Sequence, residues 1–170
     1  MRTQSLSGVV LFLLVAMLSY AELPPTLTSV EVGDFGPGGG VIFAVPGQKT
    51  SLEVWLQAAP EDWYAGGDPL AALKDARQLA DTYAVEATEP ALVGNRLSPA
   101  GGWRLPTIEE LQLLFEARGQ IPGLVMPSFY WSSSTAGDGS EILDMFSGYR
   151  ERGRPDGRHR VRPVRTLIVE

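Results

Sequence analysis

Apolar and polar positions follow a helical spacing in two parts of the chain. In one of them, the apolar stripe from Ile108 to Phe115 is interrupted by glutamate and glutamine side chains that face the opposite way. Thr107 and Glu110 match a capping box, in which each side chain bonds the backbone N–H of the other. Pro106 disfavours helical geometry at the residue before it. The pattern predicts a helix that begins at Ile108 and ends near Gly119.

The other stripe runs from Leu70 to Tyr83 and predicts a helix that ends near Ala84. Asp68 followed by Pro69 is typical of a helix start, because Asp caps free backbone N–H groups and Pro suits the first helical turn. We therefore expect this helix to open directly after Asp68.

Elsewhere, short apolar runs between turn residues predict β-strands. These strands are expected at 29–32, 41–45, 53–58, 130–133, 142–146, near 149 and at 159–169, with turns at 137–140 and 154–157 and an irregular stretch at 86–100. The glycine-rich segment 33–40 predicts turns with positive φ and close backbone approach. A phosphate-binding loop is disfavoured there, because the Lys-Ser/Thr ending is missing. Two helices and a β-rich second half predict an α+β fold with a mainly antiparallel sheet.

The N-terminal end has the pattern of a secretory signal peptide over residues 1–21, with Arg2 before an apolar run and small residues at the expected cleavage site. The apolar run is too short for a membrane-spanning helix. Residues 22–28 are expected to form a linker, and residues 29–170 a single domain. The sequence contains no cysteine, which excludes disulfides and thiolate metal sites. We expect a protein that is exported to the periplasm or secreted, with no transmembrane segment after cleavage.

Four motifs occur in order along this domain: VGDFGPGGGVIF at 32–43, GGWRLPT at 101–107, YWSSS at 130–134 and VRPVR at 161–165. Together they resemble the bacterial Lcl C-terminal-like domain family, named for the end domain of a collagen-like adhesin. The resemblance implies a C-type-lectin-like fold, distantly similar to the formylglycine-generating enzymes, and a role in adhesion to sulfated glycans. The residues it marks as a fold signature are Trp103, Arg104, Pro106, Thr107, Glu110, Trp131, Ser132, Arg162 and Arg165.

Charge is distributed unevenly on this acidic chain, whose net charge is −6. Residues 150–170 carry seven arginines against three acids. Arginine binds sulfate, phosphate and carboxylate bidentately, so the segment is a candidate site for an acidic glycan, whereas the acidic body argues against nucleic acid. The candidate ligand-binding arginines are Arg150, Arg152, Arg154, Arg158, Arg160 and Arg162. In a strand, Arg158, Arg160 and Arg162 would share one face. The alternative is that these arginines pair with the acidic body.

Aromatic residues offer another candidate contact. Trp63 and Tyr64 lie in a predicted loop with glycines, where they would be exposed to a sugar or a protein partner; the alternative is a loop folded back on the core. Trp103 and Trp131 are expected in the core, because fold-defining motifs surround them.

Catalytic and metal-binding patterns are weak. Ser132, Ser133 and Ser134 could act with His159, but no Gly-x-Ser-x-Gly elbow surrounds them, and serines that satisfy backbone groups are the favoured interpretation. Arginines beside His159 should disfavour its protonation.

A calcium site from Asp138, Glu141 and Asp144 fits the ion's preference for carboxylates, but the usual sugar-binding lectin motifs do not occur. We expect no catalytic residue, cofactor or metal. The sequence predicts a non-catalytic binding or adhesion module; the alternatives are an envelope protein-interaction domain that uses Trp63 and Tyr64 and, less favoured, a hydrolase.

Overall fold

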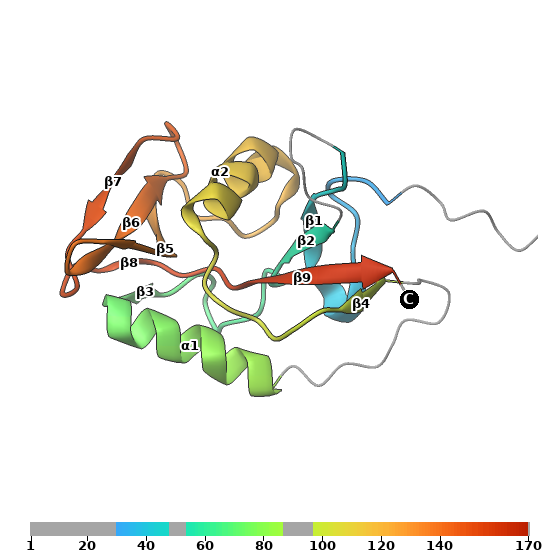
Figure 1. Ribbon diagram of the computed structural model, residues 1–170, viewed down its shortest axis with the longest axis horizontal. Coiled ribbons are helices and arrows are strands. Elements are labelled where there is room, and N and C mark those ends of the chain that lie inside the picture. The colour runs from blue at the N-terminus through green and yellow to red at the C-terminus, as the bar shows by residue number, and fades with distance from the viewer. Residues whose placement is uncertain (1–29, 48–53, 87–96, 170) are drawn as a thin grey trace, which may run out of the picture.

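The computed structural model describes residues 30–47, 54–86 and 97–169. The predicted signal peptide and linker lie outside the described residues. Within the described ranges, two α-helices and nine strands form an α+β fold, as predicted (Figure 1). The helices are α1 (Leu73–Glu86) and α2 (Ile108–Ala117), and two short 3-10 helices are η1 (Pro37–Gly39) and η2 (Arg118–Gln120). The strands are β1 (Val41–Ala44), β2 (Trp55–Ala58), β3 (Leu70–Ala71), β4 (Leu97–Pro99), β5 (Phe129–Ala136), β6 (Gly139–Asp144), β7 (Arg150–Gly153), β8 (His159–Arg160) and β9 (Val164–Val169).

The strands form two sheets. One has the order β1-β2-β9-β4 and is antiparallel throughout. The other has the order β3-β8-β5-β6-β7 and is antiparallel except where β5 and β8 run parallel. In Figure 1, β8 and β9 follow each other along the red end of the chain, which passes from the five-stranded sheet to the four-stranded one.

One continuous strand was predicted at 159–169, and this was wrong: the segment forms two strands, β8 and β9. Residues 161–163 separate β8 from β9. Pro163 has no backbone N–H to give to a ladder, and Arg162 turns its side chain into the core. β4 was also missed, because its pairing with β9 is set by residues far away in sequence.

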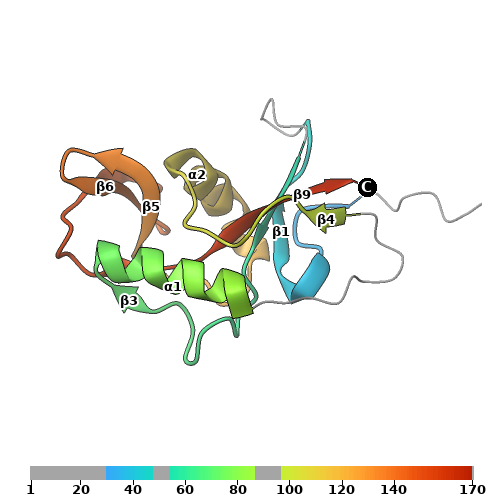
Figure 2. The same ribbon diagram turned by 60° about the horizontal axis from the view of Figure 1, so that its bottom comes forward.

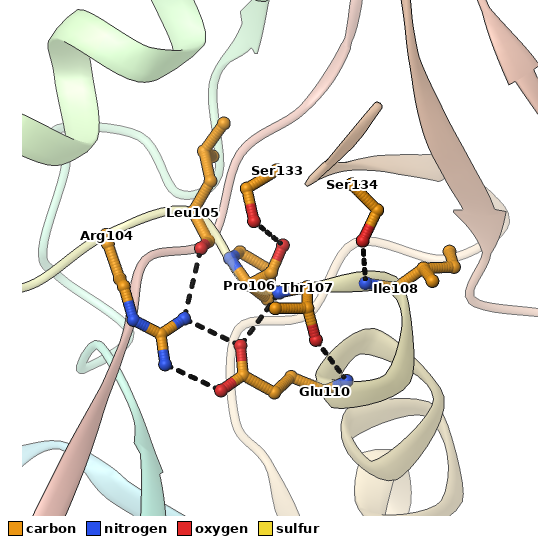
Figure 3. A network of polar contacts seen from close by, with 8 residues as sticks. All are labelled: Arg104, Leu105, Pro106, Thr107, Ile108, Glu110, Ser133 and Ser134. Carbon is orange, nitrogen blue, oxygen red and sulfur yellow. Dashed lines mark hydrogen bonds and ion pairs between the residues drawn. The ribbon is translucent and has the colours of Figure 1, made fainter. Parts of the chain in front are cut away.

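The start of α2 agrees with the sequence pattern in detail (Figure 3). Glu110 N–H donates to the Thr107 hydroxyl at 3.2 Å, and Thr107 N–H donates to the Glu110 carboxylate at 2.7 Å. Arg104 donates from both terminal nitrogens to that carboxylate at 2.6 Å, which raises the pKa of Arg104. The helix begins at Ile108 as predicted and ends at Ala117, two residues before Gly119.

The start of α1 was predicted wrongly. The helix begins at Leu73, and Leu70 belongs to β3, where it pairs with Arg160. Asp68 does not cap the helix, because its carboxylate is buried and accepts hydrogen bonds from the Trp63 indole at 2.8 Å and the Tyr130 hydroxyl at 2.6 Å.

The glycine-rich segment 33–40 has the turns and the close approach that were predicted. Gly38 has φ +64°, and the buried Gln57 amide donates to the carbonyls of Pro37 at 2.9 Å and Gly40 at 2.8 Å. A Cβ at Gly40 would lie 2.6 Å from the Ala58 carbonyl oxygen, so the segment can pack on β2 only without side chains there. The strand expected at 29–32 is absent from its described part, 30–32, which leads into a turn.

Trp103 and Trp131 are buried in the core, as predicted. The Trp131 indole donates to the Ala71 carbonyl at 2.8 Å, which ties β5 to β3. No helix in the described ranges is long and apolar enough to cross a membrane.

Candidate ligand-binding groove

Arg162 was wrongly predicted to bind a ligand, because it lies in the core and is not available to a surface ligand. Its side chain is 1% exposed. Its Nε lies 2.7 Å from a carboxylate oxygen of Asp68, an ion pair without hydrogen-bond alignment, and its Nη1 donates to the Ala59 carbonyl at 2.8 Å. Arg162 therefore neutralises a buried acid and satisfies a buried carbonyl.

Arg165, the last of the seven arginines, is also internal. It donates to Gln57 Oε1 at 2.7 Å and to the Pro37 carbonyl at 2.6 Å, and its guanidinium lies 4.3 Å from the centre of the Trp103 ring. These contacts hold the glycine-rich segment against the four-stranded sheet.

Arg158, Arg160 and Arg162 do not share one strand face, contrary to the prediction. β8 ends at Arg160, which is half-buried and donates to the Asp68 carbonyl at 2.5 Å. Arg158 is exposed and donates from one nitrogen to the Leu70 carbonyl at 2.8 Å. Of these three residues, Arg158 alone presents its guanidinium to solvent.

The remaining candidates lie on β7 and directly after it. Arg150 is exposed and donates to the Gln112 side chain at 3.3 Å, and Arg152 forms an ion pair with Asp138. Arg154 is exposed and has no side-chain partner within residues 30–47, 54–86 and 97–169. The structure thus spreads the six candidate arginines over the core and the surface and does not gather them into one site.

Trp63 is buried, with 9% of its surface exposed, so the expectation that it is exposed was wrong. The indole N–H is drawn inward by Asp68, and the ring lies 5.5 Å from Tyr83, edge to face. Tyr64, its neighbour at 5.6 Å, is 40% exposed and remains accessible. In this loop, Trp63 therefore packs against the core, and Tyr64 is accessible from solvent.

Arg158 and this aromatic pair meet in one groove of about 510 Å³, between the loop at 63–64, β3 and α1. Tyr83 lines the same groove from α1. The sequence pattern placed Tyr83 in the buried stripe of the helix, together with Leu79, and carried no signal that both residues line a groove. The groove offers aromatic surface, a phenol hydroxyl and a guanidinium within one cavity.

The serines of β5 form hydrogen bonds with backbone groups, which confirms the interpretation favoured from the sequence. Ser132 donates to the Glu141 carbonyl at 2.7 Å. Ser133 donates to the Pro106 carbonyl at 3.2 Å, and Ser134 accepts from the Ile108 N–H at 3.0 Å (Figure 3). The described hydrogen bonds connect none of them to a histidine.

His159 packs edge to face on Trp131, with ring centres 4.6 Å apart. Burial lowers the pKa of His159, and the charge of Glu151 opposes that shift in part. The sequence also predicted a lowered pKa for His159, but it attributed the shift to the neighbouring arginines, whereas burial is the cause.

Asp138 and Asp144, which were considered for calcium, are engaged elsewhere. Asp138 pairs with Arg152, while Asp144 accepts from the Ser147 hydroxyl at 2.6 Å and from two backbone N–H groups of its own turn. Burial tends to raise the pKa of Asp144, yet these hydrogen bonds lower it overall. Within residues 30–47, 54–86 and 97–169, no three acidic or histidine side chains are grouped to hold a metal ion.

No protein-family model and no curated protein matches this chain. The fold signature residues of the resemblance occupy structural positions in the molecule, as Arg104, Glu110 and Thr107 do at the start of α2. Membership of the Lcl C-terminal-like family and the C-type-lectin-like arrangement stay predictions.

Proposed function

We propose that this protein is an exported, non-catalytic binding module of the C-type-lectin-like kind that recognises acidic glycans in the groove between Tyr64 and Arg158. The observation that carries the proposal is the convergence of these two residues, 94 positions apart in sequence, on one groove. Export rests on the pattern of residues 1–21, and the lectin-like arrangement rests on the order of the four motifs.

The chemistry of the groove suits an acidic sugar unit. Tyr64 presents an apolar ring and a polar hydroxyl, which match the C–H face and the hydroxyl groups of a pyranose. Arg158 uses one nitrogen for the Leu70 carbonyl and keeps further N–H donors for a carboxylate or a sulfate.

Asp75 also lines the groove and repels a second anionic group beside the first. A ligand that alternates hydroxyl-rich and acidic positions therefore fits better than a uniformly charged polyanion. Among anionic ligands, the groove therefore favours acidic glycans over polyphosphates.

The proposal is tested by titrating the purified protein with a sulfated heparin-type hexasaccharide and with a neutral maltohexaose, each at low and high salt. We expect the sulfated sugar to bind more tightly, and its affinity to fall as salt rises, because solvent-exposed charge pairs are screened. Tyr64→Ala and Arg158→Gln should each weaken binding by about tenfold, which corresponds to about 1.4 kcal/mol for one lost contact.

Arg150→Gln is the matched control, because Arg150 is also exposed but lies on β7, outside the groove. Its affinity should equal that of the wild type. Equal losses in Arg150→Gln and Arg158→Gln would contradict a groove site and indicate diffuse attraction to the basic segment. Circular dichroism of each variant checks that the fold is retained.

A protein partner in the cell envelope is the second candidate, but at a different surface from the one predicted. With Trp63 buried, the most exposed aromatic side chains near one another are Phe146, 68% exposed, and Tyr149, 61% exposed, on the turn between β6 and β7. Exposed aromatics are enriched at protein interfaces. Recovery of the same partner in cross-linking experiments with wild type and with a Phe146→Ser, Tyr149→Ser variant would reject this candidate.

A further inference from the structure

A second groove of about 670 Å³ lies on the other side of α1. It is lined by Lys74 and Arg77 from the helix, by Asp138 from the turn between β5 and β6, and by Pro155 from the turn before β8. Figure 2 shows α1 at the front, with β3 below it in the view and the β5–β6 hairpin above it. The helix thus has the Tyr64–Arg158 groove along one flank and this second groove along the other.

The two grooves meet at Gln78 and Thr82, which line both of them. These residues are four positions apart on α1, so they lie one above the other on the helix surface, about one turn or 5.4 Å apart. Both are exposed. Their amide and hydroxyl groups form an uncharged polar ridge that can donate to and accept from sugar hydroxyls.

The second groove has two cations without partners. Neither the Lys74 nor the Arg77 side chain has a hydrogen bond or an ion pair with any residue of the described ranges, and both side chains are exposed. Of the two acids in this groove, Asp138 is already paired with Arg152, while Asp81 lies one turn further along the helix from Arg77. The end of the groove at Lys74 and Arg77 is therefore the place where an anionic group is favoured.

We propose that the two grooves form one site for a linear acidic oligosaccharide that crosses α1; this inference rests on the proposed function. One sugar unit lies on Tyr64 with its acidic group at Arg158. The chain then passes over the ridge of Gln78 and Thr82, and a following acidic unit lies at Lys74 and Arg77. The ligand class is thereby narrowed from acidic glycans in general to extended chains with repeated acidic units, as opposed to single terminal sugars.

Chain length is the variable that tests the proposal. The purified protein is titrated with a sulfated heparin-type disaccharide and with the hexasaccharide of the same series. Because only the longer chain reaches both grooves, the hexasaccharide should bind at least about tenfold more tightly than the disaccharide, a factor beyond the few-fold gain expected from its larger number of equivalent units.

A Lys74→Gln, Arg77→Gln variant should lose this length advantage and keep the wild-type affinity for the disaccharide. An Arg150→Gln, Arg154→Gln variant is the control: it removes the same charge from the surface outside both grooves, and its length advantage should be unchanged.

Three results would overturn the inference. If disaccharide and hexasaccharide bind equally to the wild type, or if the Lys74→Gln, Arg77→Gln variant keeps the length advantage, the site is confined to the Tyr64–Arg158 groove and the proposed function still stands. If neither sugar binds, the proposed function fails together with the extended site.

Discussion

The arginines at 150–158 and those at 160–165 lie next to each other in sequence, yet the first group is exposed and the second is half-buried or buried. In the first group the side chains are exposed, and their partners lie at the surface: the Gln112 side chain, the Asp138 carboxylate and the carbonyl of the exposed Leu70. In the second group Arg162 and Arg165 are buried and donate to main-chain carbonyls of distant segments. Spacing and charge in the sequence therefore do not decide whether an arginine is free to bind a ligand. The groups that surround it in the fold decide this.

The segments contacted by the buried group explain why arginine is used there. Arg162 binds the Ala59 carbonyl just after β2, and Arg165 binds the Pro37 carbonyl in the glycine-rich segment. These carbonyls have no strand partner, and a guanidinium offers five donors in a planar fork. Each arginine thus replaces hydrogen bonds that regular secondary structure would otherwise supply.

The largest effect is expected from Arg162→Ala. Removing the guanidinium leaves the Asp68 carboxylate, which is fully buried, without its cation, so the free energy of unfolding should fall by about 3–5 kcal/mol. Urea unfolding measures this loss. Arg154→Ala, an exposed arginine without a described side-chain partner, should change it by less than about 0.5 kcal/mol. Similar losses in the two variants would show that the buried and the exposed arginines do not differ in their contribution to stability.

Arg165→Lys should destabilise the protein by about 2–3 kcal/mol, although the charge is kept. Lysine lacks the planar fork that reaches Gln57 Oε1 and the Pro37 carbonyl together. The Pro37 carbonyl keeps the hydrogen bond from the Gln57 amide, so the buried acceptor that loses its donor is Gln57 Oε1. The measurement is the urea unfolding midpoint. A variant as stable as the wild type would show that charge alone, and not the fork geometry, holds the glycine-rich segment.

Arg152→Ala tests how much an exposed arginine of the first group contributes to stability. The Arg152 and Asp138 side chains are 54% and 72% exposed, so their ion pair should contribute less than about 1 kcal/mol, and less again at high salt. Thermal unfolding at two salt concentrations tests this. A fall of more than about 2 kcal/mol in the free energy of unfolding would mean that the exposed arginines at 150–158 also stabilise the fold.

The smallest effect concerns His159, which lies between the two groups. Its folded pKa is lowered by burial, so the unfolded chain takes up the proton first as pH falls below the ordinary value of 6.5. The contribution of neutral His159 to stability is therefore present above that pH and is lost as pH falls. Melting temperatures at pH 7.5 and 5.5 should differ less for His159→Gln than for the wild type, whereas parallel shifts would contradict this assignment.

The sequence predicted well what depends on neighbouring residues. The capping box of Thr107 and Glu110 lies within one helical turn, so the start of α2 follows from local chemistry alone. The turn at 154–157 and the packing of the glycine-rich segment were also predicted correctly, because glycine adopts backbone conformations closed to other residues and proline fixes its own φ. The turn expected at 137–140 is shorter than predicted, because Gly139 and Ser140 belong to β6.

The errors at the start of α1, at Trp63 and at Arg162 have a common origin in Asp68. Its sequence context suggested a helix cap, but Tyr130 and Arg162, which are 62 and 94 residues away, bury its carboxylate, and the same carboxylate turns Trp63 inward. One long-range interaction thus moved the start of α1, removed an aromatic and an arginine from the candidate site, and left Tyr64 and Arg158 as the accessible pair. No local pattern contains this information.

Backbone amide NMR titration with the sulfated hexasaccharide tests most directly whether binding belongs to the groove or to the basic segment as a whole. The account predicts that the largest chemical-shift changes fall on Tyr64, Arg158 and the exposed face of α1 from Lys74 to Thr82, with small changes on β7. Changes centred on β7 and the turn at 154–157, with the loop at 63–64 unaffected, would contradict it.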